Sequence, residues 1–150
     1  MSSILCLYKY ENYEEEVDDA SGDWWDDIPR YNSRQSRLHE VTEKGDRAYV
    51  VTYKDGRCYL VGRITISKKV PNPPSHPYGR FGIEGDPRHS QFYKFGSKDV
   101  TGVLRQLEFK TGKRIGSSMR PLSWHFRTIR ELTDGDVAFL ESHIPKSSIS

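Results

Sequence analysis

The sequence predicts an α+β fold, in which a mixed β-sheet or small β-barrel carries short helices on its periphery. A hairpin signal within residues 46–70 and a helix-capping pattern at Thr133 are two of the observations that predict it. The third is size and composition, because 150 residues suit one domain and 12% aromatic residues can build a core. We therefore expect a single domain over residues 1–150.

The strands are predicted by apolar, β-prone segments that end at turn residues. They are expected at residues 3–9, 46–53, 57–70, 91–95 and 122–130. Asp55-Gly56 joins the second and third strands as a tight hairpin turn, because this pair tolerates positive φ angles. Gly62 is a candidate β-bulge in the third strand.

Helices are predicted where a capping residue precedes apolar residues at helical spacing. They are expected at residues 33–42, 97–109 and 133–141. Asn32 and Ser33 are candidate caps of the first helix, and Thr133 with Asp136 forms a capping box for the last. Residues 71–90 hold five of the eight prolines and are expected to form a long loop without regular structure.

Charge is distributed unevenly along the chain. Residues 1–27 carry nine acidic residues and one lysine, whereas residues 28–150 carry 22 basic and 12 acidic residues. We expect an acidic loop at residues 11–23. The basic remainder indicates an anionic partner, although a solvated surface with an acidic loop explains the charge equally well. In a third interpretation, the acidic stretch lies over the basic face and screens it.

The chain lacks the sequence motifs of several function classes. The chain has no phosphate-binding glycine loop, no nucleophile elbow and no HExxH motif, and its five histidines are dispersed. Cys6 and Cys58 cannot form a disulfide framework or a four-thiolate zinc site. We therefore expect no metal, no cofactor and no catalytic residue. With no apolar run of about 18 residues and no secretory signal, we also expect a cytoplasmic protein without a membrane partner.

The densest group of unusual residues is WWDDIPRYNSRQSR, residues 24–37. Aromatic rings can stack on a nucleobase, amides and carboxylates can read its edge, and arginines can bind phosphate. For Trp25 or Tyr31 alone, a position in the core is the simpler interpretation, but the whole set favours a binding site. Two further groups combine aromatic and basic residues: residues 78–81 and residues 120–127.

The segment WDDIPRYNSR, residues 25–34, resembles the W-D-x-V-x-N-Y-x-x-R segment of EVE domains. KGDRAYVV, residues 44–51, and LVGRI, residues 60–64, are similar to the two strands that follow in that family. The resemblance covers about residues 24–70. It departs from the family pattern at Arg30, where the family often has asparagine.

EVE domains belong to the PUA-like superfamily, together with YTH and ASCH domains. The resemblance therefore implies a small PUA-like mixed β-barrel with short flanking helices and an aromatic pocket for a flipped, modified base. The pocket residues expected are Trp24, Trp25, Asp26, Ile28, Tyr31, Asn32 and Trp124. The residues expected to contact the nucleic-acid backbone are Arg30, Arg34, Arg37, Tyr78, Arg80 and Arg127.

The leading hypothesis is a non-enzymatic module that recognises a modified base, with methylated DNA favoured over RNA. Modified-base readers often accompany restriction or defence nucleases, so a nuclease partner is part of this hypothesis. An RNA-binding PUA-like domain, a protein-interaction module and a small nucleotide-acting enzyme remain alternatives. Asp26, Asp27 or Glu84 would be the acid–base candidates of such an enzyme.

Overall fold

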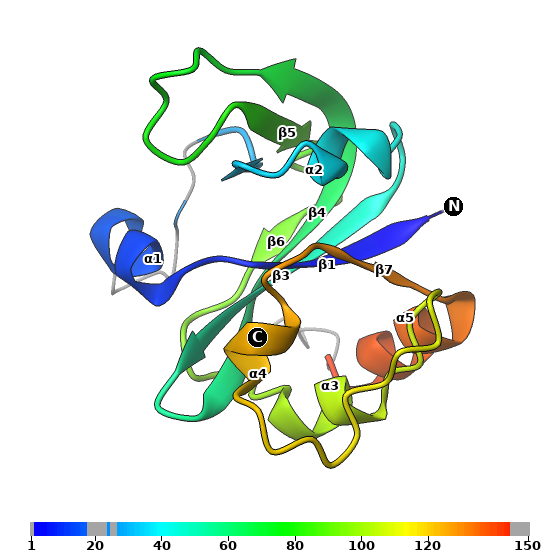
Figure 1. Cartoon of the computed structure of the whole chain (residues 1–150). Helices are drawn as coiled ribbons and strands as arrows, with labels where there is room; N and C mark the ends of the chain where they lie inside the picture. Colours follow the sequence, from blue (N-terminus) through cyan, green and yellow to red (C-terminus); the bar gives the residue numbers. More distant parts are fainter. Residues whose placement is uncertain (1, 18–23, 25–26, 145–150) are drawn as a thin grey trace.

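The chain folds as one mixed β-sheet with short helices at its periphery (Figure 1). The computed structural model describes residues 2–17, 24 and 27–144, without the side chains of Glu16 and Trp124. In the described residues the sheet has seven strands: six follow the order β2-β5-β4-β3-β1-β7, and β6 pairs with β4 outside this path. The described residues contain no helix with the length and apolar character needed to cross a bilayer.

The strands are β1 (Ser3–Leu7), β2 (Arg30–Ser33), β3 (Arg47–Lys54), β4 (Arg57–Pro71), β5 (Phe81–Gly85), β6 (Gln91–Phe92) and β7 (Arg130–Leu132). The helices are α1 (Tyr10–Glu16), α2 (Arg37–Glu40), α3 (Thr101–Gln106), α4 (Leu122–His125) and α5 (Asp134–Ser142). The hairpin of β3 and β4 confirms the predicted turn, with Asp55 at φ 52° and Gly56 at φ 83°. The capping box of α5 is also confirmed, because Thr133 Oγ1 accepts a hydrogen bond from Asp136 N at 2.9 Å.

A β-bulge next to Gly62 decides which face of the sheet β4 serves. Val50 pairs with Gly62 and Val51 pairs with Leu60, so Val61 is the extra residue. Before the bulge, Leu60 packs in the core cluster beneath α3, α4 and α5; after it, Ile64 packs in the cluster on the opposite face. The extra residue shifts the two-residue alternation by one, so β4 contributes to both cores.

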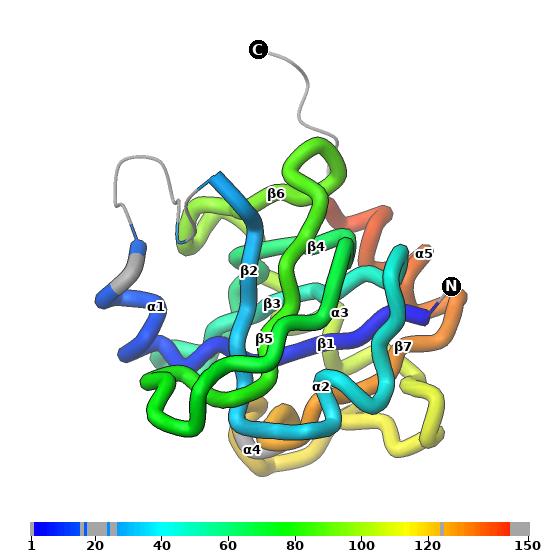
Figure 2. Tube along the Cα trace, turned by 90° about the horizontal axis from the view of Figure 1, so that it is seen from above, coloured from blue at the N-terminus to red at the C-terminus, as the bar shows by residue number. Residues whose placement is uncertain are grey.

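The cluster on the face opposite α3, α4 and α5, called the second core, lies between the two halves of the bent sheet. β1 and β3 send alternate residues into it, such as Ile4 and Val50, which are fully buried. β5 and β2 fold over this face and cross β1 and β3, as Figure 2 shows. Because β4 is 15 residues long, its second half can pair with β5 while its first half pairs with β3.

The expected barrel is not closed, because β2 and β7, the two strands at the ends of the strand order, do not pair with each other. β7 covers the neighbouring edge of β1 only from Ser3 to Leu5, so the end of β1 at Leu7 faces the gap. A side-chain hydrogen bond crosses this gap, from Tyr31 Oη to the carbonyl oxygen of Leu7 at 2.7 Å. The gap is the place where the sheet leaves room for a cavity.

Two expected loops contain regular structure. Within residues 11–23, the described part belongs to helix α1 up to Glu16, because Tyr10, Tyr13 and Val17 recur at helical spacing and pack on the second core. Residues 18–23 lie outside the described residues. The expected loop 71–90 contains strand β5, whose glycines are sites of close packing rather than of turning. A Cβ atom on Gly82 would lie 2.6 Å from Asn32 Oδ1.

The prediction of a strand over residues 122–130 was wrong for most of its length. Helix α4 begins at Leu122, and β7 starts only at Arg130. The buried residues Leu122, Phe126 and Ile129 are spaced by four and three positions, which is a helical period rather than a period of two. The helices predicted at 33–42 and 97–109 are shorter than expected, and strand β2 occupies the start of the first.

Candidate functional site

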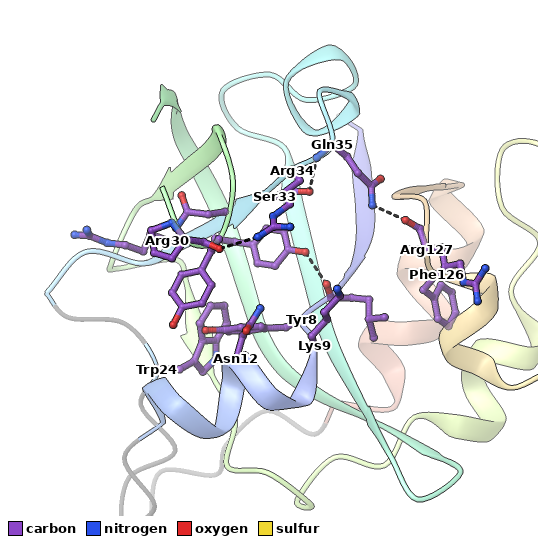
Figure 3. Close-up of a pocket in the computed structure, with 15 residues that line it drawn as sticks. Tyr8, Lys9, Asn12, Trp24, Arg30, Ser33, Arg34, Gln35, Phe126 and Arg127 are labelled. Atoms are coloured by element: carbon purple, nitrogen blue, oxygen red, sulfur yellow. Dashed lines mark hydrogen bonds between the residues drawn. The ribbon is translucent and has the colours of Figure 1, made fainter. Parts of the chain in front are cut away.

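The gap between β1 and β2 holds a cavity of about 550 Å³ (Figure 3). Its walls come from the end of β1, helix α1, strand β2, the proline-rich loop and the segment after α4. The lining residues are Leu7, Tyr8, Lys9, Asn12, Trp24, Arg30, Tyr31, Asn32, Ser33, Arg34, Gln35, Pro77, Tyr78, Phe126 and Arg127.

Three aromatic rings form the inner wall of the cavity in fixed positions. Trp24 is 4% exposed, and its Nε1 donates to the carbonyl oxygen of Val61 at 2.8 Å, which ties it to the bulge of β4. The Tyr8 ring packs edge-on against Trp24 at 4.8 Å and against Tyr31 at 6.1 Å between centroids. Burial, and secondarily Cys6, raises the pKa of Tyr31, so its hydroxyl stays protonated and donates to Leu7.

Two amide side chains supply polar groups between the rings and the rim. Asn32 Oδ1 accepts a hydrogen bond from Asn72 Nδ2 at 2.8 Å, which orients the Asn32 amide. Asn32 Nδ2 and the side chain of Asn12 form no hydrogen bond with any described residue. These groups can therefore bond to the polar edge of a planar ligand.

The proline-rich loop is held against β2 and closes one side of the cavity. Gly79 has φ +121°, and a Cβ atom there would lie 2.3 Å from the carbonyl carbon of Ser33. Asn72 Nδ2 donates to the Gly79 carbonyl oxygen at 3.0 Å, and Arg34 Nη2 donates to that of Pro77 at 3.3 Å. These contacts place Pro77 and Tyr78 beside the cavity.

The opposite wall is anchored by Gln35 at the start of the α2 turn. Its Nε2 donates to the Arg127 carbonyl oxygen, and its Oε1 accepts from Ile129 N at 3.0 Å. Arg37 Nε donates to the Ile129 carbonyl oxygen at 3.0 Å. The segment that carries Arg127 is thereby fixed relative to β2, although the two are far apart in sequence.

Four cationic side chains lie in the cavity wall: Lys9, Arg30, Arg34 and Arg127. The described lining residues include no carboxylate, and none of the four forms an ion pair with a described Asp or Glu. All four are exposed. The described lining of the cavity therefore carries a net positive charge, which favours an anionic ligand.

Of the predicted site residues, the structure brings seven together at the cavity: Trp24, Arg30, Tyr31, Asn32, Arg34, Tyr78 and Arg127. Ile28 is 40% exposed and Arg80 is exposed, and neither lines the cavity. Arg37 is paired with Glu131 at 3.2 Å instead. Trp25 and Asp26 lie outside the described residues, and Trp124 lies in α4 with its side chain not described.

The sequence interpretation missed the contribution of β1, α1 and Gln35. Tyr8 and Lys9 end the first predicted strand and Asn12 comes shortly after it, and their mixture of ring, cation and amide was the available signal. Gln35 stood inside the predicted segment 24–37, but nothing local indicated that it would reach Arg127.

The candidate acid–base groups and the two cysteines do not line this cavity where they are described. Glu84 on β5 pairs with Lys68 Nζ at 3.4 Å, and Asp27 is exposed. Burial raises the pKa of Cys58 to about 12 and that of Cys6 further, so both thiols stay protonated. Within the described part of the chain, no group of three or more His, Cys, Asp or Glu residues could hold a metal ion.

Comparison with known proteins supports the fold and does not extend to function. No protein-family model matches the chain, and no curated protein matches it. Among solved structures, the chain is similar to the NMR structure of Rpa0253 from Rhodopseudomonas palustris, a structural genomics target. The two share 14% sequence identity at a TM-score of 0.54, over 100% of this chain and 99% of that one.

Proposed function

We propose that this chain is a non-enzymatic nucleic-acid-binding module that takes one modified base, preferably in DNA, into the cavity between β1 and β2. The observation that carries the proposal is one cavity that combines three things: buried aromatic rings, the amide nitrogen of Asn32 and the Asn12 amide without a hydrogen bond to a described residue, and cations without described carboxylate partners. The proposal has two further parts. The open barrel is related to PUA-like domains, and a nuclease is the functional partner of the chain.

The cavity volume suits a base with its modification. Binding cavities for small molecules range from about 300 to 1,000 Å³, and this one has about 550 Å³. Extruding a base from a duplex costs a few kcal/mol, whereas stacking on an aromatic ring contributes about 1–3 kcal/mol per base. Tyr31 and Trp24 supply rings, and the Asn12 and Asn32 amides supply the hydrogen bonds that identify an edge.

The preference for a modified base follows from the apolar part of the wall. One methyl group buried against the rings contributes about 0.8 kcal/mol, which corresponds to about a fourfold preference. The cations then hold the flanking phosphates without reading sequence. The segment 25–34 that resembles EVE domains contributes Tyr31, Asn32 and Arg34 to this arrangement.

The test is fluorescence-anisotropy binding to one short duplex at near-physiological salt. The duplex is unmodified or carries 5-methylcytosine, 5-hydroxymethylcytosine or N6-methyladenine, and an RNA of matched sequence forms a separate arm. We expect at least about a fourfold preference for one modified DNA. Tighter binding to the RNA would assign the 2′-hydroxyl as the recognised group. Equal binding to all DNA forms that fades with salt would contradict base recognition and leave only a basic surface.

The matching variant is Asn12→Ala, because this half-buried amide supports no other described group. One lost hydrogen bond costs about 1 kcal/mol, so we expect about a fivefold loss with the preferred base and less with the others. Gln106→Ala removes an exposed amide from α3, outside the cavity, and should leave all affinities unchanged. Equal losses in both variants would remove Asn12 from the proposed contact.

A further inference from the structure

A second cavity lies directly beside the first. It has a volume of about 390 Å³ and is lined by Leu7, Lys9, Tyr10, Glu11, Tyr53, Ser123 and Arg127. Leu7, Lys9 and Arg127 also line the first cavity. The two cavities are therefore neighbours that share one wall, and that wall carries two cations.

The second cavity also has aromatic side chains. Tyr53 is half-buried at the end of β3, and Tyr10 begins helix α1. Lys54 Nζ lies 3.9 Å from the centroid of the Tyr10 ring, and the Phe95 ring packs edge-on at 5.2 Å. Tyr10 is thus held in place, while Tyr53 forms no hydrogen bond to a described residue through its side chain. Each cavity offers an aromatic ring to a planar group.

We propose that the two cavities hold consecutive nucleotides of a single strand, with the linking phosphate bound between Lys9 and Arg127. This inference rests on the function proposed for the first cavity and adds the strand state. Successive nucleotides are joined by one phosphate, and the shared wall supplies two cations without a described carboxylate partner. Across the described lining of both cavities, four cations face one carboxylate, Glu11.

A single strand fits this arrangement better than a duplex does. Two bases in neighbouring cavities are both unpaired and both separated from the stack. A duplex would have to break two adjacent base pairs, each at a cost of a few kcal/mol, whereas a single strand avoids the cost of pairing. The backbone of Arg127 is held in place beside the proposed strand, because Gln35 Nε2 donates a hydrogen bond to its carbonyl oxygen.

The test uses a labelled nine-nucleotide DNA strand with the preferred base at its centre. Anisotropy is measured for the intact strand, for its blunt duplex, and for strands with an abasic site on either side of the centre. We expect the single strand to bind about tenfold more tightly than the duplex. We expect an abasic site on one side to weaken binding about tenfold, and on the other side to have little effect.

The variant Tyr53→Leu removes the ring of the second cavity but retains apolar packing. It should weaken binding of the intact strand about fivefold. For the strand whose abasic site already weakens binding, the variant and the unchanged protein should have the same affinity. Phe139→Leu is the control, because Phe139 is a half-buried ring on α5 that lines neither cavity. Urea midpoints of both variants establish that they fold.

The outcomes separate the two proposals. If both abasic strands bind like the intact strand while Asn12→Ala still weakens binding, the second cavity is not a nucleotide site and the first remains. If the duplex binds as tightly as the single strand, the strand-state inference is wrong. If no strand is preferred and Asn12→Ala has no effect, both proposals fail.

Discussion

Basic side chains near α5 and basic side chains at the cavity have different partners. Near α5, Arg47 and Arg63 both bond to Glu141, with nitrogen–oxygen distances of 3.1 and 2.9 Å. Tyr49 Oη donates to the same carboxylate at 2.5 Å. At the cavity between β1 and β2, Lys9 and Arg127 have no described carboxylate partner.

The difference separates charges that hold the fold from charges that are available to a ligand. Burial first, and then the hydrogen bond to Glu141, raises the pKa of Tyr49, so the hydroxyl remains a donor in the Glu141 cluster. A half-buried cluster of this kind loses stability when one member is removed. Exposed and unpaired cations contribute little to stability but attract an anion. Variants in the two groups should therefore affect different measurements.

The largest loss of stability is expected from Asp136→Ala in α5, the helix of Glu141. Asp136 is 3% exposed, and its carboxylate accepts backbone N–H bonds from Glu108 and Phe109 at 2.8 Å and from Thr133 at 3.0 Å. Removing it leaves these donors unpaired at a cost of about 3 kcal/mol, measured by urea unfolding. Asp134→Ala, in the exposed first turn of α5, should cost less than about 1 kcal/mol. Equal losses would contradict this role.

Glu141→Gln tests the cluster itself. The substitution keeps the shape of the side chain but removes the charge that Arg47 and Arg63 share. We expect a loss of about 2 kcal/mol in the free energy of unfolding, with DNA affinity unchanged.

The matched control for Glu141→Gln is Glu108→Gln, because the Glu108–Arg114 pair is about 60% exposed on both side chains. Glu108→Gln should lower the free energy of unfolding by at most about 0.5 kcal/mol, as for other exposed ion pairs. A loss as small as this in Glu141→Gln would show that the cluster does not hold α5 to the sheet.

The parts of the fold that depend on neighbouring residues could be predicted from the sequence. The Asp55-Gly56 turn and the Thr133–Asp136 box follow from local backbone preferences, and both are confirmed. The segment 122–130 was misassigned because its alternating polar residues suggested a strand, whereas burial follows a helical period. Helix α1 was missed because its acidic residues suggested a loop, although Tyr13 is buried and Tyr10 is partly buried.

The cavity could be predicted only in part, because it is assembled from distant segments. Tyr31, Asn32 and Arg34 come from one short segment whose composition indicated binding. Lys9, Gln35 and Arg127 meet there only because β2 folds over β1 and Gln35 reaches the segment after α4. No local pattern encodes a contact over 92 residues of sequence.

Gly79→Ala sharpens the comparison at the cavity. The positive φ and the 2.3 Å approach to the Ser33 carbonyl leave no room for a methyl group, so the loop must move away from β2. We expect about a tenfold loss of DNA affinity, because Pro77 and Tyr78 leave the cavity wall. Gly102→Ala on α3 has open space and should bind normally. Normal binding by both variants would show that the loop does not shape the site.

The smallest effect is expected from Arg127→Ala, which should leave stability unchanged and weaken all oligonucleotides evenly by about fivefold. The reason is that a phosphate contact carries no base information, so affinity falls while modified-base preference stays the same. The slope of log K against log salt should become shallower by about 0.7 for single strands or 0.9 for duplexes. Arg88→Ala removes an equal charge in the exposed turn after β5 and should leave this slope nearly unchanged. An equal change of slope in both variants would mean that net charge, rather than the cavity, attracts the nucleic acid.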